Sequence, residues 1–227
     1  MAMDLNVLLC LAAPLLVMFF FVSEKSVRRV LMFLIFGMLA CFTAGYINTF
    51  ISQILGYSMV EAALYIAPIV EECLKAIPIV IFFLLIKPDF KTLLPVAISC
   101  GVGFATLESV LYLITGVANP AEVLLRGFST GVMHAMTVAL FAVLLWYVTQ
   151  KGLTPSWFIT VMCGFGVIAG GITLHGCYNL LINSGGTAQL VGYVVPTMIA
   201  VVYGVMLFIW NRRTRRDGTD AADNTSR

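Results

Sequence analysis

The sequence predicts an all-α fold, a polytopic bundle of about seven transmembrane helices. The chain of 227 residues is 61% hydrophobic and 11% charged, with a mean hydropathy of +1.01. Soluble domains carry about 25% charged residues, so this composition indicates an integral membrane protein. The apolar stretches are long enough to cross a ~30 Å hydrocarbon core as helices. They lack the period-2 alternation of a barrel, and backbone groups in lipid must therefore be satisfied within helices.

The expected spans follow one another with short connections. They cover residues 5–22, 30–50, 61–86, 92–115, 127–148, 157–182 and 188–210. The basic residues near the N-terminus follow the first apolar stretch, whereas a signal peptide would place them before it, so we expect an uncleaved first span. A chain of this length should form one membrane domain, residues 1–211. The polar tail, 212–227, is expected to be disordered.

The basic residues lie between alternate spans and predict the orientation of the chain. One set of connections, together with the tail, contains Lys25, Arg28, Arg29, Lys87, Lys91, Lys151, Arg212, Arg213, Arg215, Arg216 and Arg227. Only Arg126 falls in the opposite set. Because basic residues are enriched on the cytoplasmic side, we expect the N-terminus outside and the C-terminus in the cytoplasm.

The cysteines argue against a disulfide-stabilised or zinc-stabilised protein, and the net charge says little about partners. All six cysteines lie in apolar stretches without a CxxC pair, and they are Cys10, Cys41, Cys73, Cys100, Cys163 and Cys177. We therefore expect buried free thiols rather than a disulfide framework or a structural zinc site. The net charge of +2 gives no indication of a nucleic-acid partner, and none is expected.

Ionisable residues deep within the expected spans indicate a functional site. They are Glu71, Glu72, Lys75, Glu108, His134 and His175. Each costs a few kcal/mol at the middle of a bilayer, so such residues usually face the interior of a bundle. Counting from the outer ends of their spans at 1.5 Å per residue places them at depths of roughly 10–16 Å. Four helices are therefore expected to carry ionisable groups to one layer in the outer half of the membrane.

The third span carries adjacent charges in "APIVEECLKAIP". Glu71 and Lys75 are spaced i,i+4 with the acid first, the favourable order for a helical ion pair. Glu72 points about 100° away, so we expect one carboxylate to pair with Lys75 and the other to project elsewhere. Pro68 and Pro78 bracket the group and are expected to kink the helix. An ion pair that only fixes helix packing is the structural alternative.

The next two spans add further candidates. Gly101 and Gly103 are expected to allow close approach of another helix. Glu108 needs a partner within the bilayer. The candidate partners are Lys75, His134 and His175. By itself His134, with Thr130 and Thr137 on its face, is equally well explained as a core histidine.

His175 and Asn179 in the sixth span are spaced i,i+4 and share one face of the helix. Two hydrogen-bond donors directed at a single point suit an oxyanion site, and interhelical hydrogen bonding is the structural alternative. Gly170, Gly171 and Gly176 are expected to let another backbone approach this face.

The candidate residues favour hydrolysis of an amide without a covalent intermediate. Neither Ser109 nor Cys177 has the position of a nucleophile relative to these residues. A carboxylate can instead act as the general base on water, while donors on a neighbouring helix stabilise the tetrahedral oxyanion.

The combination resembles the PrsW family of intramembrane endopeptidases and, more remotely, the CAAX-protease and bacteriocin-processing superfamily. The matching elements lie within about residues 60 to 182. They are "EECLK" (71–75) for EExxK, "FATLE" (104–108) for FxxxE, His134, and "HGCYN" (175–179) for HxxxN. All four elements occur in the expected order on consecutive spans, which makes the resemblance specific.

The resemblance implies a glutamate-type mechanism without a metal or another cofactor. It assigns Glu71 as the base and Glu108 as a residue that shares or orients the water. Glu72 and Lys75 would organise the base. This chain departs from the CAAX enzymes, which carry a histidine in place of Glu108 and an arginine in place of Lys75, so the division of roles between the glutamates stays open.

The resemblance also implies the remaining roles and the biological setting. His175 and Asn179 would form the oxyanion site, His134 would orient the substrate or a carboxylate, and Phe104 would support the site. The expected substrate is a membrane-anchored protein, such as an anti-sigma-factor-like regulator, cleaved near the outer face of the bilayer. The expected location is the bacterial cytoplasmic (inner) membrane.

Three other functions fit parts of the pattern. A proton- or ion-coupled transporter would also place glutamate, lysine and histidine inside a bundle, but no internal repeat is evident. A metalloprotease could use glutamate and histidine as zinc ligands, but the sequence contains no HExxH. A catalytically inactive membrane scaffold would keep the same fold.

Overall fold

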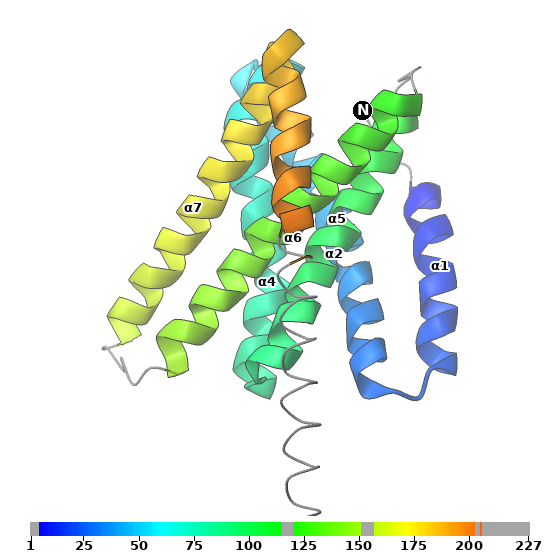
Figure 1. Cartoon of the computed structure of the whole chain (residues 1–227), viewed down its shortest axis with the longest axis vertical. Coiled ribbons are helices and arrows are strands. Elements are labelled where there is room, and N and C mark those ends of the chain that lie inside the picture. Colours follow the sequence, from blue (N-terminus) through cyan, green and yellow to red (C-terminus); the bar gives the residue numbers. More distant parts are fainter. Residues whose placement is uncertain (1–4, 115–119, 151–156, 203–204, 206–227) are drawn as a thin grey trace, which may run out of the picture.

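The predicted all-α fold is confirmed in the computed structural model, which describes residues 5–114, 120–150, 157–202 and 205, apart from the side chains of 150, 157–161 and 163. Its helices alternate in direction, with α1 at one edge and α7 at the other (Figure 1). They are α1 (Leu5–Phe21), α2 (Lys25–Leu55), α3 (Met59–Glu61), the π-helix η1 (Ala62–Ile66), α4 (Ala67–Ile86), α5 (Phe90–Ile114), α6 (Pro120–Gln150), α7 (Trp157–Ser184) and a helix at Gly186–Val202. No strand occurs in the residues described.

Four of these helices are long and apolar enough to cross a membrane, within the described part of the chain. They are Lys25–Leu55, Phe90–Ile114, Pro120–Thr149 and Gly164–Asn183. The helices α1 and Gly186–Val202 are apolar but shorter. The remaining predicted span contains α4, whose first half carries the charges singled out above. These helices support an integral membrane protein.

Several helices extend beyond the ends of the predicted spans. The helix α2 begins at Lys25, so this residue, Arg28 and Arg29 lie in its first turns rather than in a connection. Likewise, α6 begins at Pro120, a residue favoured in the first turn, and Arg126 is helical. The helices continue through charged and aromatic residues that lie outside the apolar stretches used to predict the spans. Lys151 and the tail, 212–227, lie outside the described residues.

The third predicted span consists of three segments. Ser58 and Glu61 form a capping box, in which the Ser58 N–H donates to Glu61 Oε2 at 2.8 Å. The π-helix η1 follows, and the N–H of Ala67 bonds to the carbonyl of Ala62, five residues earlier. Pro68, in the first turn of α4, has no N–H to donate back into this segment. The expected interruption near Pro68 is therefore a change of winding, a feature frequent at functional sites.

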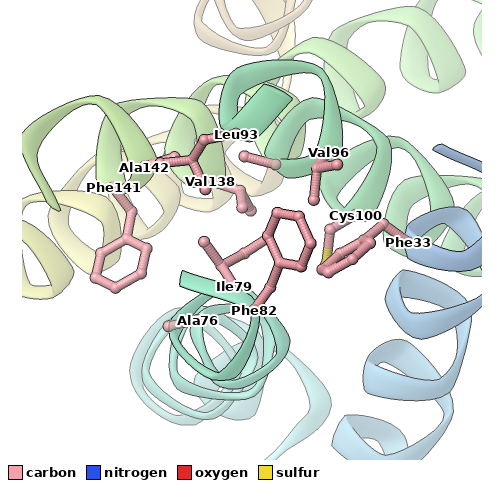
Figure 2. Close-up of a cluster of buried hydrophobic side chains, with 11 residues drawn as sticks. Phe33, Ala76, Ile79, Phe82, Leu93, Val96, Cys100, Val138, Phe141 and Ala142 are labelled. Carbon is pink, nitrogen blue, oxygen red and sulfur yellow. The ribbon is translucent and has the colours of Figure 1, made fainter. Parts of the chain in front are cut away.

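An apolar core holds the second half of α4 against its neighbours. Figure 2 shows Ile79 and Phe82 of α4 directed towards side chains of α2, α5 and α6. The cluster contains Phe33, Ala76, Ile79, Phe82, Leu93, Val96, Ala97, Cys100, Val138, Phe141 and Ala142. Because lipid is as apolar as these side chains, the cluster stabilises the bundle through close packing rather than transfer from water.

Two glycines of α5 permit the close helix contacts that the sequence predicts. A Cβ atom on Gly103 would collide with the carbonyl oxygen of Leu34 in α2. A Cβ atom on Gly101 would collide with the carbonyl oxygen of His134 in α6 and lie 2.7 Å from the Cα of Ala135. Gly101 therefore determines how near the backbone of His134 lies to α5.

Two predictions about small residues are wrong in part. Gly170 faces open space among the described residues, and the backbone nearest to a Cβ on Gly176 is the Leu64 carbonyl at an ordinary 4.0 Å. The described cysteines are free thiols; Cys41 and Cys100 are buried, whereas Cys10, Cys73 and Cys177 are exposed. The apolar lipid accommodates a thiol as well as a protein core does, so an apolar sequence context does not predict burial. The side chain of Cys163 lies outside the description.

Replacing Gly101 with alanine should lower the free energy of unfolding by about 1–3 kcal/mol, because the added methyl group forces α5 and α6 apart. The measurement is thermal or denaturant unfolding of the purified protein in detergent. Gly131→Ala in α6 is the matched control, since nothing lies within 4 Å of its added Cβ. Equal stability of the two variants would contradict the close contact.

Candidate functional site

The ammonium group of Lys75 lies at the centre of the polar layer. Its side chain is 0% exposed, and Nζ lies 2.5 Å from Glu72 Oε1 and 2.7 Å from His134 Nδ1. The ring of Phe104 lies beneath the ammonium, with Nζ 4.8 Å from its centroid. An ammonium group can only donate, so Nδ1 of His134 accepts and the proton of the neutral imidazole is on Nε2. The position of Lys75 thereby selects the tautomer of His134.

His134 connects Lys75 to the carboxylate of α5. Its Nε2–H donates to Glu108 Oε2 at 2.6 Å, and its ring contacts that of Phe104 with centroids 4.6 Å apart. Among the candidate partners of Glu108, the structure therefore selects His134. The sequence match to FxxxE places Phe104 and Glu108 on either side of one imidazole.

Glu72 extends the network to α7. Its Oε1 accepts from Lys75 and lies 2.8 Å from Nδ1 of His175. Continuous hydrogen bonds therefore join Glu108, His134, Lys75, Glu72 and His175, which come from α5, α6, α4 and α7. The expectation that four helices carry these groups to one layer is confirmed.

The expectation that one carboxylate pairs with Lys75 while the other projects elsewhere is confirmed, although the i,i+4 spacing of Glu71 and Lys75 does not decide the pair. Lys75 pairs with Glu72 at i,i+3, and Glu71 is turned instead towards α2, where Nδ2 of Asn48 donates to its Oε1 at 3.2 Å. Glu72 faces His175 of α7 instead, with its Oε1 2.8 Å from Nδ1 of that histidine. The neighbouring helices, rather than the preference of an isolated helix, select which carboxylate meets the lysine.

The second carboxylate oxygen of Glu71 has no hydrogen-bond partner in the part of the chain that the structure describes. The residue is only 9% exposed, and its buried Oε2 has no partner among the described residues. The nearest candidate, His175 Nε2, lies 3.8 Å away, beyond hydrogen-bond distance. A buried acceptor without a partner is costly, and such atoms in native structures call for a functional explanation.

Glu71 and Glu108 line the same cavity, which has a volume of about 460 Å³. The cavity lies where α5 ends, α6 begins and α7 ends, at the upper end of the bundle in Figure 1. Its other lining residues are Ala63, Ala67, Tyr112, Arg126, Asn179, Ile182, Asn183, Gly185 and Gln189. The guanidinium of Arg126 stacks on the ring of Tyr112 at 3.7 Å. The cavity brings a polar path to both carboxylates.

The structure separates the two donors expected on α7. Asn179 lines the cavity, and its Nδ2 donates to the carbonyl of Ala63 in η1 at 2.9 Å, which leaves its second N–H. Nδ1 of His175 is directed at Glu72 instead. The two side chains share a face of α7 but bond to different groups in this arrangement.

Sequence reasoning missed Asn48, Tyr178 and Ser129. Asn48 contacts Glu71 from α2, and its only signal was a polar side chain in the middle of an apolar helix. The hydroxyl of Tyr178 lies 2.8 Å from both Ser129 Oγ and Thr130 Oγ1, which joins α7 to α6 beside His175. Hydroxyl contacts between helices cannot be deduced from spacing along one helix.

Comparison with known protein families agrees with this geometry. The sequence model of the family described as "PrsW family intramembrane metalloprotease" matches residues 25–210. This chain belongs to the PrsW family. The match covers α2 to the helix at Gly186–Val202 and leaves α1 outside. No curated protein and no solved structure matches the chain. The PrsW-family protein is therefore a membrane peptidase, and an intramembrane protease implies a membrane-embedded protein as its substrate.

The family description names a metal, and the donor set of this PrsW-family protein does not fit one. Glu71, His134 and His175 each offer a ligand atom, all within 4.8 Å of one another. Both ring nitrogens of His134, however, are engaged by Lys75 and Glu108. The remaining two ligands are fewer than the three that hold a catalytic zinc ion, and the neighbouring ammonium would repel a cation.

Replacing Lys75 with methionine should lower the free energy of unfolding by about 3–5 kcal/mol, because Glu72 would keep its buried charge without the ammonium. Unfolding in detergent measures this loss. The isosteric double variant Lys75→Met/Glu72→Gln removes both charges and should recover part of the stability. Lys91→Met, at an exposed position of α5, is the control. A single variant as stable as this control would contradict the central role of the ammonium.

Proposed function

We propose that this PrsW-family protein hydrolyses a peptide bond of a membrane-anchored protein with water activated by Glu71, without a covalent intermediate or a metal. The observation that carries the proposal is the free Oε2 of Glu71, a buried acceptor on a residue that lines a polar cavity. A general base must reach the proton it removes, and this oxygen makes no competing hydrogen bond to another described residue.

The reaction requires two proton transfers. Glu71 Oε2 takes a proton from water while the water oxygen bonds to the substrate carbonyl carbon, which forms a tetrahedral oxyanion. When the intermediate collapses, the C–N bond breaks and Glu71 returns the proton to the leaving nitrogen. The products are a carboxyl group and an amine, so the reaction uses one water and regenerates the base.

Asn179 and His175 are proposed to stabilise the oxyanion. The second N–H of Asn179 is available in the cavity while its first bonds to Ala63. His175 presents Nε2 on the side of Glu71, and this nitrogen becomes a donor when the imidazole is protonated. Preorganised donors of this kind contribute about 10²–10³-fold each to a rate.

The remaining residues are proposed to hold the acid groups in place. Glu108 lines the same cavity as Glu71 and is oriented by His134, so its carboxylate can share the attacking water. Lys75 fixes both His134 and Glu72 from the centre of the network, and Phe104 packs against this ammonium.

The distribution of basic residues supports an active site that opens to the outside. Lys25 begins α2, Lys87 follows α4 and Lys91 lies in the first turn of α5. The cavity lies at the other end of these helices, so the positive-inside rule assigns it to the outer face. We propose a single membrane domain, residues 1–211, in a bacterial inner membrane. Its N-terminus is outside and its C-terminus cytoplasmic, and its substrate is a membrane-anchored protein such as an anti-sigma-factor-like regulator.

Replacing Glu71 with glutamine should lower the rate of cleavage at least about 10²-fold, because an amide cannot take the proton from water. The measurement compares new protein N-termini in cells that produce the wild type, Glu71→Gln or the exposed control Glu24→Gln. New termini near the outer end of single-span proteins should occur with the wild type and the control only. Equal termini with folded Glu71→Gln would refute the assigned base, and cytoplasmic termini would refute the orientation.

Cleavage should persist in the presence of metal chelators, because His134, one of the three potential ligands, has both ring nitrogens engaged by Lys75 and Glu108. The test uses purified protein in liposomes with a substrate from the preceding experiment, treated with EDTA or 1,10-phenanthroline. Activity that falls with chelator and returns on addition of zinc would show instead that His134 exchanges its partners for a metal.

A further inference from the structure

The contact between Asn48 and Glu71 extends the proposed site to α2. This helix contains none of the sequence motifs that resemble those of the PrsW family. We infer that Asn48 is a positioning residue for the general base, an inference that rests on the proposed function of Glu71. Its Nδ2 lies 3.2 Å from Glu71 Oε1 and joins two helices whose contacting residues are 23 positions apart.

This hydrogen bond distinguishes the two oxygens of the base. Asn48 donates to Oε1, while Oε2 has no partner among the described residues and is the oxygen nearest to Nε2 of His175. A carboxylate on a flexible side chain can rotate and exchange its oxygens, which would displace the reactive lone pair. A donor on one oxygen holds the other in a defined direction, the function that supporting hydrogen bonds have in preorganised sites.

Helix packing does not explain the amide of Asn48. Its Nδ2 donates only to Glu71 in the described structure, and its Oδ1 is buried without a partner. A leucine of similar size would avoid this unsatisfied acceptor at a position where α2 contacts α4. Packing does not offset the free-energy cost of burying this amide. The hydrogen bond from Asn48 to Glu71 explains why an amide is present at this position.

The expected kinetic effect follows from the charge of the acceptor. A hydrogen bond to a charged group is stronger than one between neutral groups, and its loss should lower kcat about 10- to 100-fold. The residue acts through Glu71 and does not line the cavity, so KM should stay within about twofold of the wild-type value.

The test measures cleavage of a quenched fluorescent single-span peptide, with the sequence of the segment identified by terminus mapping, in liposomes. Asn48→Leu removes the amide at similar size, and Asn48→Gln retains it on a longer side chain. Thr49→Val is the matched control, since Thr49 is half-buried on the same helix and its hydroxyl bonds only to the Gly45 carbonyl. We expect a selective loss of kcat in Asn48→Leu, partial recovery in Asn48→Gln, and wild-type kinetics in the control.

Two results would overturn the inference. One is a kcat of Asn48→Leu within about twofold of the wild type. The other is a loss that follows the fraction of unfolded protein in detergent, with no recovery in Asn48→Gln, which would assign the residue to helix packing. Glu71→Gln is measured alongside. If it cleaves at the wild-type rate, the proposed base itself is wrong; if it is inactive while Asn48→Leu is active, only the positioning role fails.

Discussion

The buried ammonium of Lys75 is the interaction on which the rest of the site depends. A fully buried charge in a bundle surrounded by lipid must be compensated locally, because no solvent can reach it. Glu72 supplies the opposite charge and His134 supplies a neutral acceptor, so one cation sets two hydrogen bonds and one tautomer. These bonds connect α4 with α6 and α7 at one level of the bundle. The bond between His134 and Glu108 connects α5 to the same layer.

The surrounding fold makes this polar layer possible by separating it from an apolar core along one helix. The first half of α4 carries the charges, and the second half, from Ala76 onwards, packs into the core formed with α2, α5 and α6 (Figure 2). Gly101 brings the backbone of His134 against α5, so the close packing of the two helices also determines the reach from imidazole to Glu108. Packing and electrostatics therefore specify the same arrangement.

Membership of the PrsW family shows that the protein is a membrane peptidase. The family description also implies a metal ion, and the side chains of this site do not fit one. In this chain, both ring nitrogens of His134 are hydrogen-bonded, one to Lys75 and one to Glu108. The ammonium group of Lys75 would also repel a metal cation. Hydrogen bonds can perform the tasks that a metal performs elsewhere: they can orient water, hold a base in place and stabilise developing charge. The proposed chemistry therefore depends on the positions of protons within one connected network.

The sequence by itself determined the fold class, the approximate spans and the residues of the polar layer, because apolar length and charges inside a membrane are strong physical signals. Only the tertiary structure decided which residues meet. Spacing along α4 places Glu71 and Glu72 on different faces, but the neighbouring helices decided that Glu72 takes Lys75 and Glu71 takes Asn48. The same limit explains the exposed cysteines and the separate partners of His175 and Asn179. A helix sequence specifies the direction of each side chain, whereas its partner depends on how the helices pack.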